Sequence, residues 1–127
     1  MTQNNQEMIK LLIADDEKEF ASTLVARLEL RNFKVSMVNS GIDALEALEH
    51  DLPDVMLLDL KMPDLDGLEV LARLRVKYPK LQVIILTGHG SFEAGKEGME
   101  LGAYDYIMKP VDLSRLIEIV QAAYEAK

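Results

Sequence analysis

The sequence has no cysteine among its 127 residues. It can therefore form neither a disulfide framework nor a metal site built from thiolates. Basic residues are also scarce, because 14 lysines and arginines face 22 aspartates and glutamates, which leaves a net charge of -8. Nucleic acids and anionic membranes both require a basic surface, so this charge predicts no direct binding to either.

Long hydrophobic runs are missing as well. No apolar stretch approaches the roughly 20 residues needed to span a bilayer. The opening residues MTQNNQEMIK are polar and lack a hydrophobic signal region. The composition, 49% hydrophobic and 28% charged, is typical of a soluble globular protein. We therefore expect a single cytoplasmic domain over residues 1–127, large enough to bury its own core.

Apolar runs alternate along the chain with amphipathic stretches, a pattern typical of repeated strand and helix units. Strands are expected at 8–14, 34–38, 55–58, 82–86 and 106–108. The first helix is expected at about 18–31, with a left-handed stop at Asn32, and the second after an N-cap at Ser40, with Ile42, Leu45 and Leu48 recurring every third residue. The third is expected from Leu68 to Tyr78, before Pro79. The fourth is expected at 91–101 and the fifth after an N-cap at Asp112.

The strands at 8–14, 55–58 and 82–86 are apolar on both alternating faces, so helices must cover both sides of the sheet. Right-handed crossovers then predict an α/β fold of the flavodoxin-like (βα)5 type. Its doubly wound, five-stranded parallel sheet has the strand order 2-1-3-4-5. The switch point between the first and third strands is where such sheets bind ligands.

The fourth expected helix contains two interior glycines, Gly95 and Gly98. Each costs about 0.5 to 1 kcal/mol relative to alanine, so a marginal helix is predicted. Two explanations remain open. The glycines could let the helix pack closely on the sheet, or they could keep the segment loose so that it can switch.

Polar residues of different kinds follow four of the apolar runs. They are Asp15 with Asp16, then Asp59, Thr87 and Lys109. Parallel strands end along one edge of a sheet, so these groups should converge there. Taken singly, each has an ordinary structural explanation as a cap, a strand end or a solvated charge. Their joint occurrence in this order is what makes the pattern specific.

Three clustered carboxylates repel one another unless a cation or a proton neutralises them. Mg²⁺ prefers carboxylate oxygens and completes its shell with water and phosphate oxygens. With a metal in place, Asp59 is free to act as a nucleophile in phosphoryl transfer. Thr87 would supply a hydrogen-bond donor and Lys109 a cation for the charge on the phosphoryl oxygens.

Four stretches of the sequence resemble the receiver domain of two-component response regulators, and the resemblance covers essentially the whole chain. The stretches are LLIADDE, DVMLLDLKMPDLDGLEV, VIILTGHG and GAYDYIMKP. The resemblance implies that Asp59 accepts a phosphoryl group from a sensor histidine kinase or a histidine phosphotransfer protein. It also implies a signalling domain, which catalyses only its own phosphorylation and dephosphorylation. The face formed by the fourth helix, fifth strand and fifth helix would control an output domain or target protein.

The same resemblance assigns roles around Mg²⁺, or Mn²⁺ in its place. Asp16 is implied to ligate the metal directly, Asp15 to help hold it, and Asp59 and the backbone carbonyl of Lys61 to complete the protein ligands. Thr87 is implied to hydrogen-bond one phosphoryl oxygen.

Lys109 is implied to pair with another phosphoryl oxygen, with a cis bond to Pro110. Switching is implied to draw Thr87 toward Asp59 and to turn Tyr106 into the space left behind. Lys61 and His89 lie two residues beyond Asp59 and Thr87, where the family tunes the lifetime of the phosphoryl group. Solvent exposure alone explains both equally well.

Two other readings compete. A haloacid-dehalogenase-like phosphatase also uses an aspartyl nucleophile and Mg²⁺, but it needs its nucleophile at the end of the first strand and leaves Asp59 without a role. A degenerate receiver, used only as a phosphorylation-independent interaction module, would not need the complete set of acids with Thr87 and Lys109. Two arrangements stay open, a stand-alone shuttle and, as we expect, a receiver cut from a longer regulator, kinase or transcription factor. Homodimer formation is also left open.

Overall fold

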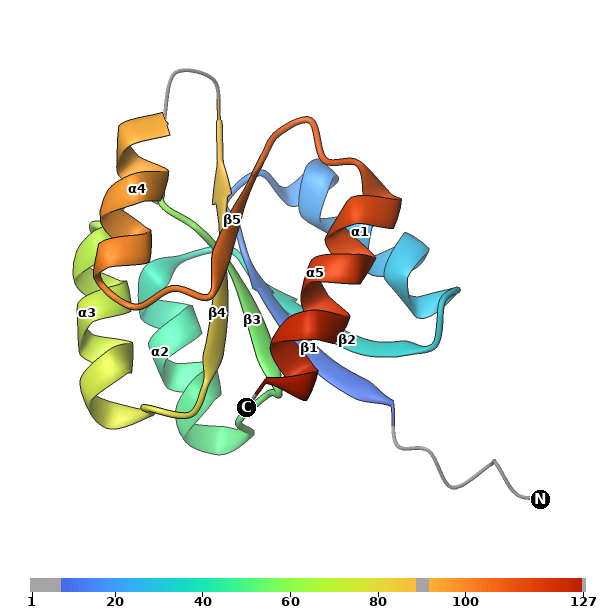
Figure 1. Cartoon of the computed structure of the whole chain (residues 1–127), viewed down its shortest axis with the longest axis horizontal. Coiled ribbons are helices and arrows are strands. Elements are labelled where there is room, and N and C mark those ends of the chain that lie inside the picture. Colours follow the sequence, from blue (N-terminus) through green and yellow to red (C-terminus); the bar gives the residue numbers. More distant parts are fainter. Residues whose placement is uncertain (1–7, 89–91, 127) are drawn as a thin grey trace.

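The computed structural model describes residues 8–88 and 92–126 (Figure 1). Within these residues, five strands alternate with five helices. The strands are β1 (Ile9–Ala14), β2 (Phe33–Val38), β3 (Val55–Asp59), β4 (Gln82–Thr87) and β5 (Asp105–Met108). The helices are α1 (Lys18–Glu29), α2 (Gly41–His50), α3 (Gly67–Lys77), α4 (Phe92–Glu100) and α5 (Leu113–Glu125).

All strand pairs are parallel, and the strand order is β2-β1-β3-β4-β5, which confirms the predicted topology. Helices α1 and α5 cover one face of the sheet, and α2, α3 and α4 cover the other (Figure 1). Successive side chains of β1 alternate between two cores, with Leu11 and Ile13 in the first core and Leu12 and Ala14 in the second. None of the described helices is long and apolar enough to cross a membrane.

The helix ends follow the local signals closely. Helix α1 stops at Glu29, slightly before the expected 31, and Asn32 adopts the predicted left-handed conformation with φ 69°. Ser40 Oγ accepts a hydrogen bond of 3.1 Å from the Asp43 amide, which confirms it as the N-cap of α2. Asp112 caps α5 in the same way. Short-range capping interactions of this kind mark the starts of α2 and α5.

Helix α2 corrects one expectation about packing. Ile42 is 60% exposed, although the repeat of Ile42, Leu45 and Leu48 suggested a common apolar face. The buried positions are Gly41, Ala44 and Leu48, which follow the true helical spacing of three and then four residues. A strict spacing of three drifts around the helix, so Ile42 turns toward solvent.

Helix α4 lies so close to the sheet that its glycines have no room for a side chain. A Cβ added at Gly98 would lie 1.9 Å from Ile85 Cδ1, and one added at Gly95 would lie 2.9 Å from Tyr106 Cδ2. Distances this short require the neighbouring atoms to move. The contacts therefore favour close packing as the reason for these glycines.

Candidate metal centre

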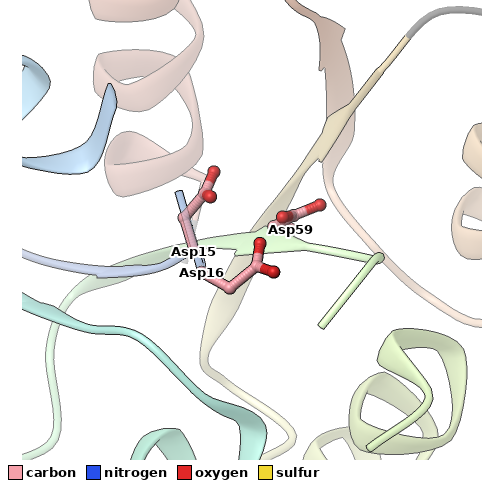
Figure 2. Close-up of side chains that lie close together, drawn as sticks. All are labelled: Asp15, Asp16 and Asp59. Atoms are coloured by element: carbon pink, nitrogen blue, oxygen red, sulfur yellow. The ribbon is translucent and has the colours of Figure 1, made fainter. Parts of the chain in front are cut away.

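Three carboxylates meet at the carboxyl edge of the sheet. Asp15 and Asp16 directly follow β1, Asp59 ends β3, and Ala14 pairs with Leu58 in the ladder between these strands. Each aspartate offers a carboxylate oxygen, and the three oxygens lie within 4.8 Å of one another. Figure 2 shows the three side chains gathered at the ends of the two strands. The predicted convergence of these acids is confirmed.

Burial makes the charge of Asp59 costly. Its side chain is almost fully enclosed, and this burial is the main cause that raises the pKa of Asp59 to about 6. The nearby charges of Asp15 and Asp16 raise the pKa further, while the Lys61 amide and Lys109 oppose the shift. A divalent cation held by these oxygens would remove the repulsion, and the donor set is the kind that Mg²⁺ prefers.

Lys109 places its ammonium group beside the acids. Its Nζ lies 2.7 Å from Asp15 Oδ2 and 3.8 Å from Asp59 Oδ2. It also forms an ion pair with Glu17, and it lies 4.4 Å from the centre of the Phe20 ring. Burial lowers the pKa of Lys109, but the bonds to Asp15 and Glu17 outweigh burial and raise that pKa above its ordinary value. The lysine is therefore held as a cation at this edge.

A backbone hydrogen bond links Lys109, which follows β5, to the end of β4. The Lys109 amide donates a hydrogen bond of 2.7 Å to the carbonyl oxygen of Thr87. The Lys109–Pro110 peptide bond is cis, as the resemblance implied. The hydrogen bond to Thr87 holds the lysine at the same edge as Thr87.

Thr87 ends β4 next to the strand that carries Asp59. Its side chain is buried, and its hydroxyl oxygen has no hydrogen-bond partner within the described residues. A buried polar group without a partner costs about 1 to 3 kcal/mol. Such a group marks a place where an oxygen of a bound molecule could complete the hydrogen bond.

The loop after β3 is fastened at two points. The Lys61 amide donates to Asp59 Oδ1 over 3.0 Å, and Lys61 forms an isolated bridge with Asp66. Asp64 accepts bonds of 2.9 Å from the amides of Gly41 and Ile42 at the start of α2. The loop is thus anchored to both the site and the neighbouring helix.

Two residues of this region escaped the sequence interpretation. Glu17 was visible beside Asp15 and Asp16, but its partner Lys109 is 92 residues away in the chain. Asp64 sits in a Pro-Asp turn, which signals a loop but not the helix that the side chain caps.

Three further residues were predicted to act in switching or in tuning the phosphoryl lifetime, namely Tyr106, Lys61 and His89. Tyr106 is half-buried on β5, where its ring is close to Gly95 of α4. The side chain of Lys61 is exposed. His89 falls outside the described residues. The roles of these three residues stay predictions.

Comparisons with known proteins agree with this geometry. The family model of the response regulator receiver domain matches residues 11–121. Regulatory protein AtoC of Escherichia coli (strain K12) is 35% identical over 116 residues, which cover 91% of this chain and 25% of AtoC. Response regulator MprA of Mycobacterium leprae (strain TN) is 35% identical over 114 residues, which cover 90% of this chain and 50% of MprA.

A solved structure shares the fold. The receiver domain of the Francisella response regulator 1452 is 33% identical, with a TM-score of 0.86 and coverage of 93% of this chain and 98% of that domain. The curated relatives are longer, and this chain spans a quarter to a half of their length. The similarity is therefore to one domain of those regulators.

Proposed function

Because this chain belongs to the response regulator receiver domain family, we propose that it accepts a phosphoryl group on Asp59 and passes the signal to an output partner. The carrying observation is the buried carboxylate of Asp59, with two further carboxylates within 4.8 Å and the Lys109 ammonium beside it. No activity beyond its own phosphorylation and dephosphorylation is proposed. The haloacid-dehalogenase-like reading is set aside, since the family is a different one.

The proposed cofactor is Mg²⁺, or Mn²⁺ in its place. Asp15, Asp16 and Asp59 would hold it through carboxylate oxygens, and Lys61 through its backbone carbonyl. The oxygen-only donor set and the repulsion among the three acids support this assignment. When bound, the metal neutralises the carboxylates and the charge on the phosphoryl oxygens.

In the proposed reaction, one carboxylate oxygen of Asp59 attacks the phosphorus of a phosphohistidine. A new P–O bond forms, the P–N bond breaks, and the histidine nitrogen leaves with the bonding electron pair. Lys109 would pair with one phosphoryl oxygen, and the Thr87 hydroxyl would donate to another. The unpartnered hydroxyl of Thr87 supports this role, because a phosphoryl oxygen would complete its hydrogen bond.

The proposed switch runs from Thr87 to the face formed by α4, β5 and α5. Movement of Thr87 toward Asp59 would leave space for the Tyr106 ring, which lies so close to α4 that a Cβ added at Gly95 would be 2.9 Å from Tyr106 Cδ2. A rotation of this ring would directly change the packing between β5 and α4. The phosphoryl group can shift this equilibrium only by binding one arrangement more tightly than the other.

The proposed partners are a sensor histidine kinase or a histidine phosphotransfer protein and an output domain or target protein. Residues 1–127 are taken as one receiver domain. Since the relatives are longer regulatory proteins, we assign any contact with nucleic acid to the rest of such a protein rather than to this acidic domain. Lys61 and His89 are proposed to tune the lifetime of the aspartyl phosphate.

The deciding experiment is the intact mass of the protein after incubation with acetyl phosphate and Mg²⁺. We expect one added phosphoryl group in the native chain and none in Asp59→Asn or after chelation of the metal. Binding of beryllofluoride, a stable analogue of the phosphoryl group, would detect the site even if the phosphoryl adduct is short-lived. Absence of both the adduct and beryllofluoride binding would leave a phosphorylation-independent interaction module.

A further inference from the structure

Lys109 is bound to two carboxylates other than Asp59. Its Nζ lies 2.7 Å from Asp15 Oδ2 and 2.5 Å from Glu17 Oε1, but 3.8 Å from Asp59 Oδ2. An ammonium group has three N–H donors, and 3.8 Å is too long for a hydrogen bond. In this arrangement the lysine is engaged by Asp15 and Glu17 rather than by Asp59.

Glu17 is well placed to hold the lysine. It is the N-cap residue of α1, yet its side chain accepts no capping bond from the helix. Its amide instead donates to Asp15 Oδ1 over 2.8 Å, which fixes its backbone next to the acids. One turn further along α1, the Phe20 ring supports the same ammonium group from 4.4 Å. Glu17 and Phe20 together contact the Lys109 ammonium group at the start of α1.

We propose that Glu17 is a positioning residue that restrains Lys109 in the unphosphorylated chain and thereby slows phosphoryl transfer to Asp59. This inference rests on the proposed function of Asp59. Lys109 Nζ lies 2.5 Å from Glu17 Oε1 but 3.8 Å from Asp59 Oδ2, so movement of the ammonium group toward a phosphoryl oxygen at Asp59 lengthens its bond with Glu17. The Glu17 side chain is 62% exposed and the Lys109 side chain 15% exposed, so Glu17 can return to water when the lysine moves inward.

Two substitutions distinguish the contact between Glu17 and Lys109 from the negative charge of Glu17. Glu17→Asp keeps the negative charge but is shorter by one methylene, and Glu17→Gln keeps the length but loses the charge. Both weaken the ion pair with Lys109. We expect both variants to be phosphorylated by acetyl phosphate with Mg²⁺ about two- to fivefold faster than the native chain, as befits one partly exposed ion pair.

Glu19→Gln is the matched control. Glu19 lies in the first turn of α1, two residues after Glu17, and both glutamates line a groove between α1 and the segment around Lys109. Among the described residues, the carboxylates within 4.0 Å of Lys109 Nζ belong to Asp15, Glu17 and Asp59. Removing the Glu19 charge should therefore leave the rate unchanged. If instead both glutamine variants react faster and Glu17→Asp behaves like the native chain, repulsion of the anionic donor explains the effect and the restraint is overturned.

A second readout does not depend on phosphorylation. In metal-free protein, the NMR signal of the Lys109 Cε–Hε group should move in both Glu17 variants and stay in place in Glu19→Gln. An unmoved signal in the Glu17 variants overturns the restraint whatever the rates are. If the native chain forms no adduct and binds no beryllofluoride, the proposed function fails, and this signal still decides whether Glu17 holds the lysine. If the native chain reacts and the Glu17 variants match its rate, only the restraint fails.

Discussion

The middle of the sheet and its carboxyl edge are built from the same strands, but they bury opposite kinds of side chain. Leu57 and Ile84 in the middle of β3 and β4 are fully buried. Asp59 and Thr87, which end these strands, are 4% and 2% exposed, yet they carry a charge and a hydroxyl group. Burial stabilises the apolar residues and penalises the polar ones. The edge of the sheet is therefore arranged for binding and the middle for stability.

Leu57→Ala should produce the largest effect, because it empties a fully buried site in the middle of β3. We expect the free energy of unfolding to fall by about 2 to 5 kcal/mol, measured by urea denaturation followed by circular dichroism. Val76→Ala is the control, since Val76 is 85% exposed. Its effect should stay within about 0.5 kcal/mol. Equal effects of the two substitutions would contradict the assigned role of the middle of the sheet.

Gly98→Ala tests the packing of α4 on the middle of β4. Alanine favours helix formation, but its Cβ would lie 1.9 Å from Ile85 Cδ1. Overpacking of this kind should lower the free energy of unfolding by about 1 to 3 kcal/mol. Ile85→Val removes that methyl group, so the glycine substitution should cost less in the double variant. A gain in stability from Gly98→Ala alone would instead indicate a loosely packed helix.

Asp59→Asn should raise the free energy of unfolding, because it removes a buried charge from the edge of the sheet. The raised pKa of about 6 means that the folded chain holds the proton of Asp59 more tightly than the unfolded chain does. The stability of the native chain should therefore fall as the pH rises from about 4 to 6, and the variant should lack this loss. Without metal, we expect the variant to be more stable by about 1 to 2 kcal/mol at pH 7 and unchanged below pH 4.

Urea denaturation across this pH range measures the difference between native and Asp59→Asn chains. Addition of Mg²⁺ should reduce it, because the cation stabilises the native carboxylates. A variant that is less stable than the native chain at pH 7 without metal would show that the charge of Asp59 is already compensated.

Thr87→Val should give the smallest effect. Valine has nearly the shape of threonine and removes a buried hydroxyl that lacks a partner. We expect the free energy of unfolding to rise by less than about 1 kcal/mol. Thermal denaturation measures this change, and Thr23→Val, at an exposed position of α1, controls for the substitution type. A clear loss of stability would show that the Thr87 hydroxyl is already hydrogen-bonded in the resting protein.

Most of the fold was predictable from short-range patterns. The apolar strands followed by amphipathic helices indicated the parallel sheet, and Ser40, Asp112 and Asn32 marked helix ends through interactions within a few residues. The exposure of Ile42 was missed, because its spacing of three from Leu45 was taken as one apolar face. Which side of a helix is buried depends on how the helix docks on the sheet as well as on its own repeat.

The acids after β1 and at the end of β3 could be predicted to meet from the sequence, because parallel strands share one carboxyl edge. Which groups contact one another at this edge depends on how the elements pack. Glu17 meets Lys109 across 92 residues, and Asp64 caps a helix that lies 22 residues earlier in the chain. The difference arises from the separation of the contacting residues along the chain. Strand and helix patterns arise between near neighbours, whereas these contacts exist only after the elements have packed together.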